Sequence, residues 1–151
     1  MTILEKKIEL ARYRLKQAEE SIEEAIYLYS GHKSSRSIIN RIYYSMFYAI
    51  LALLIFEPYS SSKHSGVLSY FNKKFIKEGI FHSELGRSVN KAFELRQSSD
   101  YRDYTELSYE QVEPFIEKSK LFLQSVKNYL EDNLFSKGGS QWKNPLSSYP
   151  L

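Results

Sequence analysis

The segment from Leu95 to Tyr104 holds the densest group of residues that could carry chemistry, with two arginines, two aspartates and two tyrosines. Arg96 and Asp100 are four residues apart, so on a helix they could form an ordinary surface ion pair worth about 0.2–0.5 kcal/mol. However, arginine before aspartate is the less favourable order, and an aspartate in the last helical turn opposes the helix dipole. Stability therefore does not explain this choice of residues, and we interpret Arg96 as a candidate ligand of an anion such as phosphate.

A second group of polar residues lies within an apolar stretch between residues 34 and 56. At helical spacings of three and four, one side of this stretch carries Ser37, Arg41, Tyr44, Ser45 and Tyr48. Polar groups on a buried helix need partners, and two interpretations are open. Arg41 could pair with an acidic residue of a neighbouring helix while the tyrosine hydroxyls form hydrogen bonds, or Arg41 and Tyr44 could face a bound phosphate.

A histidine stands between these two groups, in the sequence Ser62-Lys63-His64-Ser65-Gly66, where a helix is expected to begin. The dipole of a helix N-terminus lowers the proton affinity of a histidine and keeps it neutral and available as a base. The same residue could equally serve as a helix cap or lie in a loop. We carry His64 forward as a candidate base.

The elements that position these residues are predicted to be helices throughout. Apolar or small residues recur every three or four positions over residues 4–29, 67–75, 83–96 and 109–130. Residues 34–56 are apolar nearly all round, which predicts a central helix. Gly31 is placed to stop the first helix, Glu57-Pro58 the second and Gly79 the third. The sequence predicts an all-α fold, an antiparallel bundle of four to five helices.

The start of the last helix leaves two alternatives open. Ser108 and Gln111 have the spacing of a capping box, but Pro114 follows them. The helix therefore either kinks at Pro114 or begins there, with the proline as its first residue. A length of 151 residues favours one domain, and we expect the bundle over residues 1–135 with a flexible C-terminal tail over residues 136–151.

The composition argues against several classes of site. The chain has no cysteine and three histidines, and its inward faces lack the Glu-x-x-His pairs of di-metal bundles, so we expect no metal and no other cofactor. A net charge of +3 does not by itself mark a nucleic-acid binder. The longest apolar stretch, residues 42–56, is shorter than the roughly 20 residues of a membrane span, and the first residues are too charged for a signal peptide. A cytoplasmic protein with no membrane association is expected.

Taken together, several motifs in this order resemble the HEPN superfamily, and within it a UPF0332-like group of small bacterial and archaeal proteins. The resemblance spans residues 4–134. The motifs are Arg41-Ile-Tyr-Tyr-Ser-Met-Phe-Tyr-Ala, Ala52-Leu-Leu, Lys63-His64-Ser-Gly66-Val, the stretch from Phe71 to Phe75, and Leu95-Arg96 with Asp100-Tyr101. The resemblance implies a helical bundle that commonly forms a homodimer, with polar residues gathered near the dimer interface.

The resemblance also implies an activity, because many HEPN proteins are metal-independent endoribonucleases or toxins paired with a minimal nucleotidyltransferase antitoxin. Their signature is an arginine followed, after four to six residues, by a histidine. Arg96 matches the arginine, but the histidine positions hold Tyr101, Arg102 and Asp103, so the signature is broken. In paired systems the antitoxin can transfer AMP to a tyrosine just after the signature, which makes Tyr104 or Tyr101 the candidate modified tyrosine.

A broken signature leaves the general base open. A tyrosine with a pKa of about 10 is ionised to only about one part in a thousand at pH 7, so Tyr101 is a poor substitute for histidine. Asp100 and Asp103 are alternatives, and so is His64 if the fold or a dimer brings it near Arg96. The candidate catalytic residues are thus Arg96, Asp100, Tyr101 and His64, and the candidate RNA- or nucleotide-binding residues are Arg41, Tyr44 and Arg96. The alternative function is a non-catalytic, dimeric helical adaptor in which these polar residues brace the bundle.

Overall fold

The computed structural model describes residues 1–101 and 107–138, with the backbone alone for residues 99–101 and 137–138. Within these ranges the chain forms helices and turns and no strand, so the predicted all-α fold is confirmed. The α-helices are α1 (Ile3–Ser30), α2 (Ser35–Leu54), α3 (His64–Phe71), α4 (Ser83–Tyr101), α5 (Tyr109–Val112) and α6 (Pro114–Asn133). A π-helical turn, η1 (Asn72–Lys77), follows α3, and a 3-10 turn, η2 (Phe135–Gly138), follows α6.

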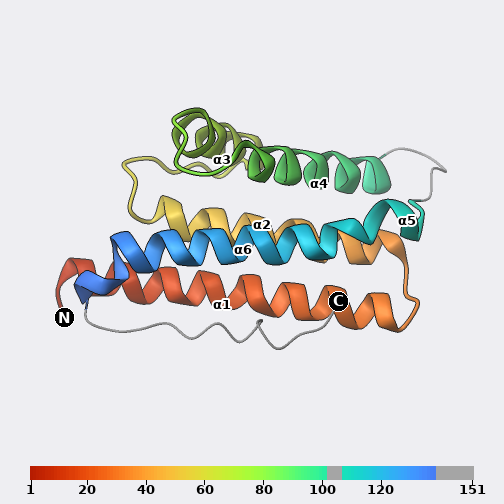
Figure 1. The fold of residues 1–151 in the computed structure, drawn as a ribbon, viewed down its shortest axis with the longest axis horizontal. Coiled ribbons are helices and arrows are strands. Elements are labelled where there is room, and N and C mark those ends of the chain that lie inside the picture. The colour runs from red at the N-terminus through yellow and green to blue at the C-terminus, as the bar shows by residue number, and fades with distance from the viewer. Residues whose placement is uncertain (102–106, 139–151) are drawn as a thin grey trace.

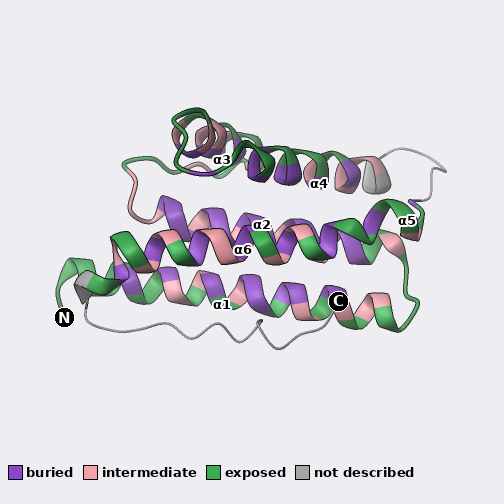
Figure 2. Cartoon of the chain, in the orientation of Figure 1, coloured by how far each residue is buried: buried purple, intermediate pink, exposed green. Residues whose placement is uncertain are grey.

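Helix α2 lies at the centre of the bundle and contacts α1, α4 and α6 (Figure 1). Twelve of its 20 residues are buried, and the buried faces of the neighbouring helices turn toward it (Figure 2). By length and composition α2 could cross a membrane, but 67% of its most apolar window is buried inside the bundle. That burial is typical of a core helix, in agreement with the predicted central position.

Side-chain caps mark the starts of α1, α2 and α5. Thr2 accepts a hydrogen bond from the backbone N–H of Glu5 at 3.1 Å, and Ser34 caps α2 in the same way. Ser108 and Gln111 form the predicted capping box at the start of α5. The capping box begins the short helix α5, which ends at Val112. Helix α6 then begins with Pro114 as its first residue, which is the second of the two predicted alternatives.

A close helix contact fixes α4 against the segment that precedes it. A Cβ added at Gly86 would lie 2.9 Å from the side-chain oxygen of Asn72 and 3.2 Å from Ile76, so only glycine lets α4 approach η1 this closely. Asn72 also donates to the side-chain oxygen of Asn90 on α4 at 3.0 Å. Gly79 adopts a left-handed φ of 79° and ends the segment where a glycine stop was predicted. These contacts hold α4, and with it Arg96, in a fixed register.

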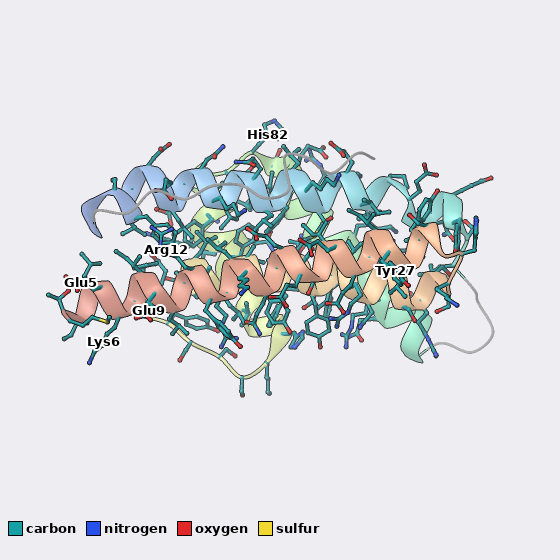
Figure 3. All side chains as sticks on the ribbon, turned by 90° about the horizontal axis from the view of Figure 1, so that it is seen from below. Glu5, Lys6, Glu9, Arg12, Tyr27 and His82 are labelled. Atoms are coloured by element: carbon teal, nitrogen blue, oxygen red, sulfur yellow. The ribbon has the colours of Figure 1, made fainter. Side chains whose placement is uncertain are left out.

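Two charged contacts join α1 to α6 on the other side of the bundle. Figure 3 shows Arg12 on the side of α1 that faces α6. Its NH1 lies 4.0 Å from Oε2 of Glu131, and its Cζ lies 4.3 Å from the ring centre of Phe135. Deeper in the bundle, Glu19 forms an ion pair with Lys127, and both side chains are buried. Burial raises the pKa of Glu19 and lowers the pKa of Lys127, because each loses hydration that its partner restores only in part.

We expect Glu19→Ala to lower the free energy of unfolding by about 3–5 kcal/mol, since it leaves the buried Lys127 ammonium without its counterion. The double variant Glu19→Leu/Lys127→Met should be at least as stable as the original chain, because it removes both desolvation costs. Urea unfolding measures both effects. Glu20→Ala, an exposed change on the same helix, is the control and should stay within about 0.5 kcal/mol. A double variant as unstable as the single one would show that the ion pair is a net source of stability.

Candidate anion-binding site

Arg96 extends from α4 onto the face of α2, where Asn40 and Tyr44 bind its guanidinium. Its Nε donates to the side-chain oxygen of Asn40 at 2.9 Å, and its NH2 donates to the Tyr44 hydroxyl at 3.4 Å. Its Cζ lies 5.1 Å from the ring centre of Tyr44 and 5.4 Å from that of Tyr43. The residue is half-buried, so these contacts orient the guanidinium of a side chain that is not fully enclosed.

His64, the first residue of α3, meets the same two tyrosines from the other side of the site. Its Nδ1 is hydrogen bonded to the Tyr43 hydroxyl at 2.8 Å, and its ring stacks on Phe47 with centroids 4.1 Å apart. The ring of Tyr44 also packs edge-to-face against the imidazole, with ring centroids 5.8 Å apart. The fold therefore brings His64 and Arg96 together, although 32 positions separate them in the sequence. We call Asn40, Tyr43, Tyr44, Phe47, His64 and Arg96 the Arg96–His64 cluster.

The cluster keeps its imidazole neutral. Burial is the main cause that lowers the pKa of His64, and the positive charge of Arg96 lowers it further. Burial also raises the pKa of the Tyr43 hydroxyl, which stays protonated at neutral pH. The direction of this pKa shift agrees with the neutral imidazole predicted from the sequence, but its causes are burial and Arg96, whereas the prediction was based on the helix dipole.

The loop before α3 fixes the position of His64. Tyr70 donates a hydrogen bond to the Glu57 carboxylate at 2.7 Å, which raises the pKa of Tyr70 to about 12. Tyr59 stacks on Tyr70 with ring centroids 4.5 Å apart. A Cβ added at Gly66 would lie 2.6 Å from the Ser61 hydroxyl, so this position must be small for the loop to fold over the first turn of α3.

Arg41 has the acidic partner that one of its two interpretations predicted, whereas its role as a phosphate ligand stays a prediction. Its NH1 lies 3.9 Å from Oε1 of Glu24 on α1, which is the acidic partner foreseen on a neighbouring helix. Its Cζ also lies 5.4 Å from the ring centre of Tyr44, next to the Arg96–His64 cluster. Ser45 was grouped with this polar side, but it is buried and donates to the backbone carbonyl of Ile42 at 2.6 Å, so it faces the core and not the cluster.

Three residues of the cluster were not singled out from the sequence. Asn40 and Tyr44 are four residues apart, as are Tyr43 and Phe47, so helical spacing places each pair on one side of α2. That spacing could have added Asn40 to the polar side. The contacts of Tyr43 and Phe47 with His64 depend on how α3 packs against α2, and no local pattern shows this.

The other candidate catalytic residues lie outside what the structure describes. The side chains of Asp100 and Tyr101 are outside the described part of the chain, and so is the whole of Tyr104, the candidate modified tyrosine. Among the described residues, no group of His, Asp and Glu side chains has the arrangement of a metal site. An open pocket of about 740 Å³ on α1 is lined by Glu20, Glu23 and Glu24, whose charge does not suit an anion.

Comparison with known proteins agrees with the fold. The HEPN domain family matches residues 11–129, a range that includes the whole Arg96–His64 cluster. A UPF0332 protein of Thermotoga maritima is 37% identical over 129 residues, which cover 85% of this chain and 97% of the relative. The chain belongs to the HEPN domain family.

Archaeal relatives extend the comparison. A protein of Methanocaldococcus jannaschii named "Putative toxin" is 38% identical over 124 residues, which cover 82% of this chain and 84% of the relative. A UPF0332 protein of Archaeoglobus fulgidus is 26% identical over 120 residues, which cover 80% of this chain and 94% of the relative.

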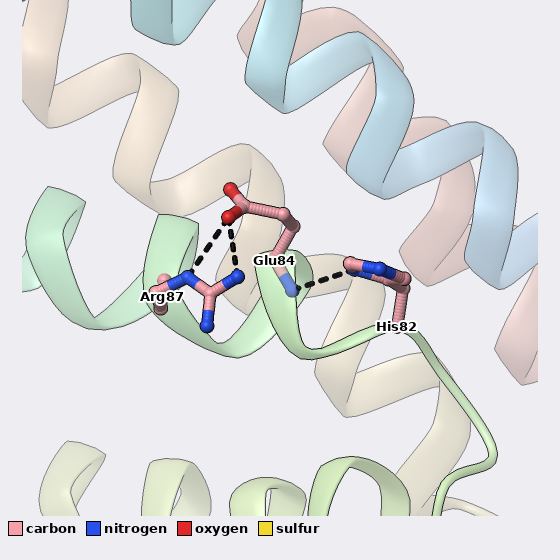
Figure 4. A network of polar contacts seen from close by, with 3 residues as sticks. All are labelled: His82, Glu84 and Arg87. Atoms are coloured by element: carbon pink, nitrogen blue, oxygen red, sulfur yellow. Dashed lines mark hydrogen bonds and ion pairs between the residues drawn. The ribbon is translucent and has the colours of Figure 1, made fainter.

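We expect Arg96→Ala to raise the pKa of His64, because it removes a positive charge that opposes protonation of the imidazole. NMR titration of the His64 ring protons measures the change. The matched control is Arg87→Ala, also on α4, whose guanidinium is exposed and is held by Glu84 one turn away (Figure 4). An unchanged His64 pKa in Arg96→Ala would show that the two groups are too far apart to interact.

Proposed function

We propose that this protein binds RNA through its phosphates and cleaves it without a metal ion, as a toxin-like member of the HEPN family. The observation that carries the proposal is that Arg96 and a neutral imidazole meet on the same two tyrosine rings. A guanidinium binds phosphate bidentately and stabilises the charge that develops during cleavage. A neutral imidazole can accept a proton near pH 7. The names of the Methanocaldococcus relatives support a toxin-like role.

In the proposed reaction, His64 takes the place of the histidine that the signature after Arg96 lacks. The reaction requires the tautomer in which the Nδ1–H of His64 donates the hydrogen bond to the Tyr43 hydroxyl oxygen, because Nε2 then carries no proton and can act as the base. Nε2 takes the proton of the ribose 2′-hydroxyl, the 2′-oxygen bonds to phosphorus, and the bond from phosphorus to the 5′-oxygen breaks. Water then protonates the leaving 5′-oxygen, so the products are a cyclic phosphate and a 5′-hydroxyl. Arg96 binds the non-bridging phosphate oxygens.

Two partners belong to the same proposal. A second copy of the chain would form the homodimer that the family resemblance implies, and a minimal nucleotidyltransferase would act as antitoxin. That enzyme would transfer AMP to Tyr104 or Tyr101, close in sequence to Arg96. We further propose that the protein acts in the cytoplasm, where RNA is available.

The adaptor remains the second candidate, and one observation favours it. Asn40 and Tyr44 hold the Arg96 guanidinium inside one protomer, as they would if Arg96 served to brace α4 against α2. In an adaptor the removal of Arg96 would cost stability without loss of a ligand. The two functions therefore predict different behaviour of one variant.

We expect the purified protein to cleave single-stranded RNA equally well with and without EDTA. Arg96→Ala and His64→Gln should each reduce the rate by a factor of 100 or more, because a positioned base or a charged transition-state ligand contributes at least about that factor. Gel analysis of labelled RNA measures the rate, and mass spectrometry identifies the cyclic phosphate. Arg87→Ala is the matched control and should cleave at the original rate. If the protein leaves RNA intact, or if EDTA abolishes cleavage, the proposed reaction is wrong.

We expect Arg96→Ala to lower the free energy of unfolding by less than about 3 kcal/mol, because Asn40 and Tyr44 can bond to water at this half-buried position once the guanidinium is gone. Urea unfolding, with RNA binding measured on the same preparation, tests this. A loss of about 3 kcal/mol or more with RNA binding unchanged would instead support the adaptor.

A further inference from the structure

Two arginines from different helices lie over one tyrosine ring. The Cζ of Arg41 on α2 lies 5.4 Å from the ring centre of Tyr44, and the Cζ of Arg96 on α4 lies 5.1 Å from it. A cation–π contact orients a guanidinium through the face of the ring and leaves its N–H groups able to donate elsewhere. Both Cζ atoms thus lie within 5.4 Å of one ring centre, so they are at most about 10.5 Å (5.4 Å plus 5.1 Å) apart.

Arg41 has donors that the described protein does not use. It forms no hydrogen bond with the described residues, and its ion pair with Glu24 is 3.9 Å long, well beyond the 2.7–2.9 Å of a charge-assisted hydrogen bond. Its side chain is only 27% exposed, so water reaches part of it. A guanidinium carries five N–H donors, and leaving them without partners at a half-buried position is costly. The oxygens of one phosphate group could accept hydrogen bonds from two of these donors.

Glu24 is placed to compete with such a ligand. Its side chain is 57% exposed on α1, and it approaches Arg41 without a hydrogen bond. An exposed pair of this kind contributes little to stability and breaks readily when a better partner arrives. Its negative charge also repels a phosphate brought close to Arg41.

We propose that Arg41 and Arg96 bind two neighbouring phosphate groups of one ligand, and that Glu24 weakens this binding by competing for Arg41. The two phosphates belong either to consecutive nucleotides of an RNA strand or to the diphosphate of a free nucleotide. The inference rests on the proposed function, which already assigns one phosphate to Arg96. It adds a second phosphate position and a carboxylate that sets the affinity.

The test compares charge-matched variants for binding to a fluorescent twelve-nucleotide 2′-O-methyl RNA, which has no free 2′-hydroxyl and so resists cleavage. At low salt, Glu24→Gln should tighten the Kd about two- to five-fold, the range expected for loss of an exposed ion pair. Glu20→Gln removes the same charge one turn earlier on α1, where the side chain is exposed, and should have a smaller effect. Fluorescence anisotropy measures each Kd.

Removal of Arg41 isolates the competition from general electrostatics. Arg41→Gln should weaken binding and reduce the slope of log K against log salt by about 0.7, the value for one phosphate contact to a single strand. In that background the further change Glu24→Gln should have no more effect than Glu20→Gln. Arg36→Gln, an exposed change on the same helix, is the control for Arg41 and should retain the original salt slope.

Nucleotide competition distinguishes the two sources of the phosphates. ADP should displace the RNA better than AMP does if the site takes a diphosphate, whereas equal and weak displacement by both assigns the site to consecutive nucleotides of a strand. The inference is wrong if Glu24→Gln changes the Kd no more than Glu20→Gln does. It is also wrong if Glu24→Gln still tightens binding in the Arg41→Gln background. Either result leaves the proposed function standing. If the original protein binds neither RNA nor nucleotide, or if Arg96→Ala binds as well as the original protein, both the inference and the proposed function are wrong.

Discussion

Burial of α2 is the constraint on which the rest of the structure depends. Most of this helix is enclosed by α1, α4 and α6, so its position is determined by apolar packing and not by the polar residues along one side. That side carries Asn40 and Tyr44, which hydrogen bond to Arg96, and Tyr43, which hydrogen bonds to His64. Because α2 is rigid, two residues from separate helices are held against it in a fixed relation.

Tyr43 shows how the same burial produces the chemistry of the site. Its ring is fully buried, yet its hydroxyl ends next to His64, which is half-buried at the start of α3. A buried hydroxyl needs a hydrogen-bond partner, and a protonated imidazole would be repelled by the positive charge of Arg96. Both requirements are met when the imidazole is neutral and bonded to the tyrosine. Packing thus selects the protonation state that a base requires at neutral pH.

The sequence was sufficient to predict the helices but only part of the site. Helical periodicity and caps such as Ser108 are local properties, so the bundle and most helix starts could be read directly. Helix α1 ends directly before Gly31, the predicted stop, but the residue with left-handed φ is His32, whose ring stacks on Tyr109 with centroids 6.4 Å apart. The meeting of His64 with Arg96 depends on how α3 and α4 pack on α2, which no spacing along the chain encodes.

Bracing and binding are not opposed explanations of the contacts around Arg96. A guanidinium that binds phosphate must be oriented before the ligand arrives, and neutral partners such as Asn40 and Tyr44 provide orientation without cancelling its charge. The same two hydrogen bonds would appear in an adaptor. What differs is the balance of free energy, because a residue kept for bracing contributes mainly to the folded state, whereas a residue kept for binding contributes mainly to the complex. The buried pair of Glu19 and Lys127 shows the first pattern, with both charges enclosed between α1 and α6. Arg96 and Arg41 are only half-buried, unlike that pair, and this is why we assign them to binding.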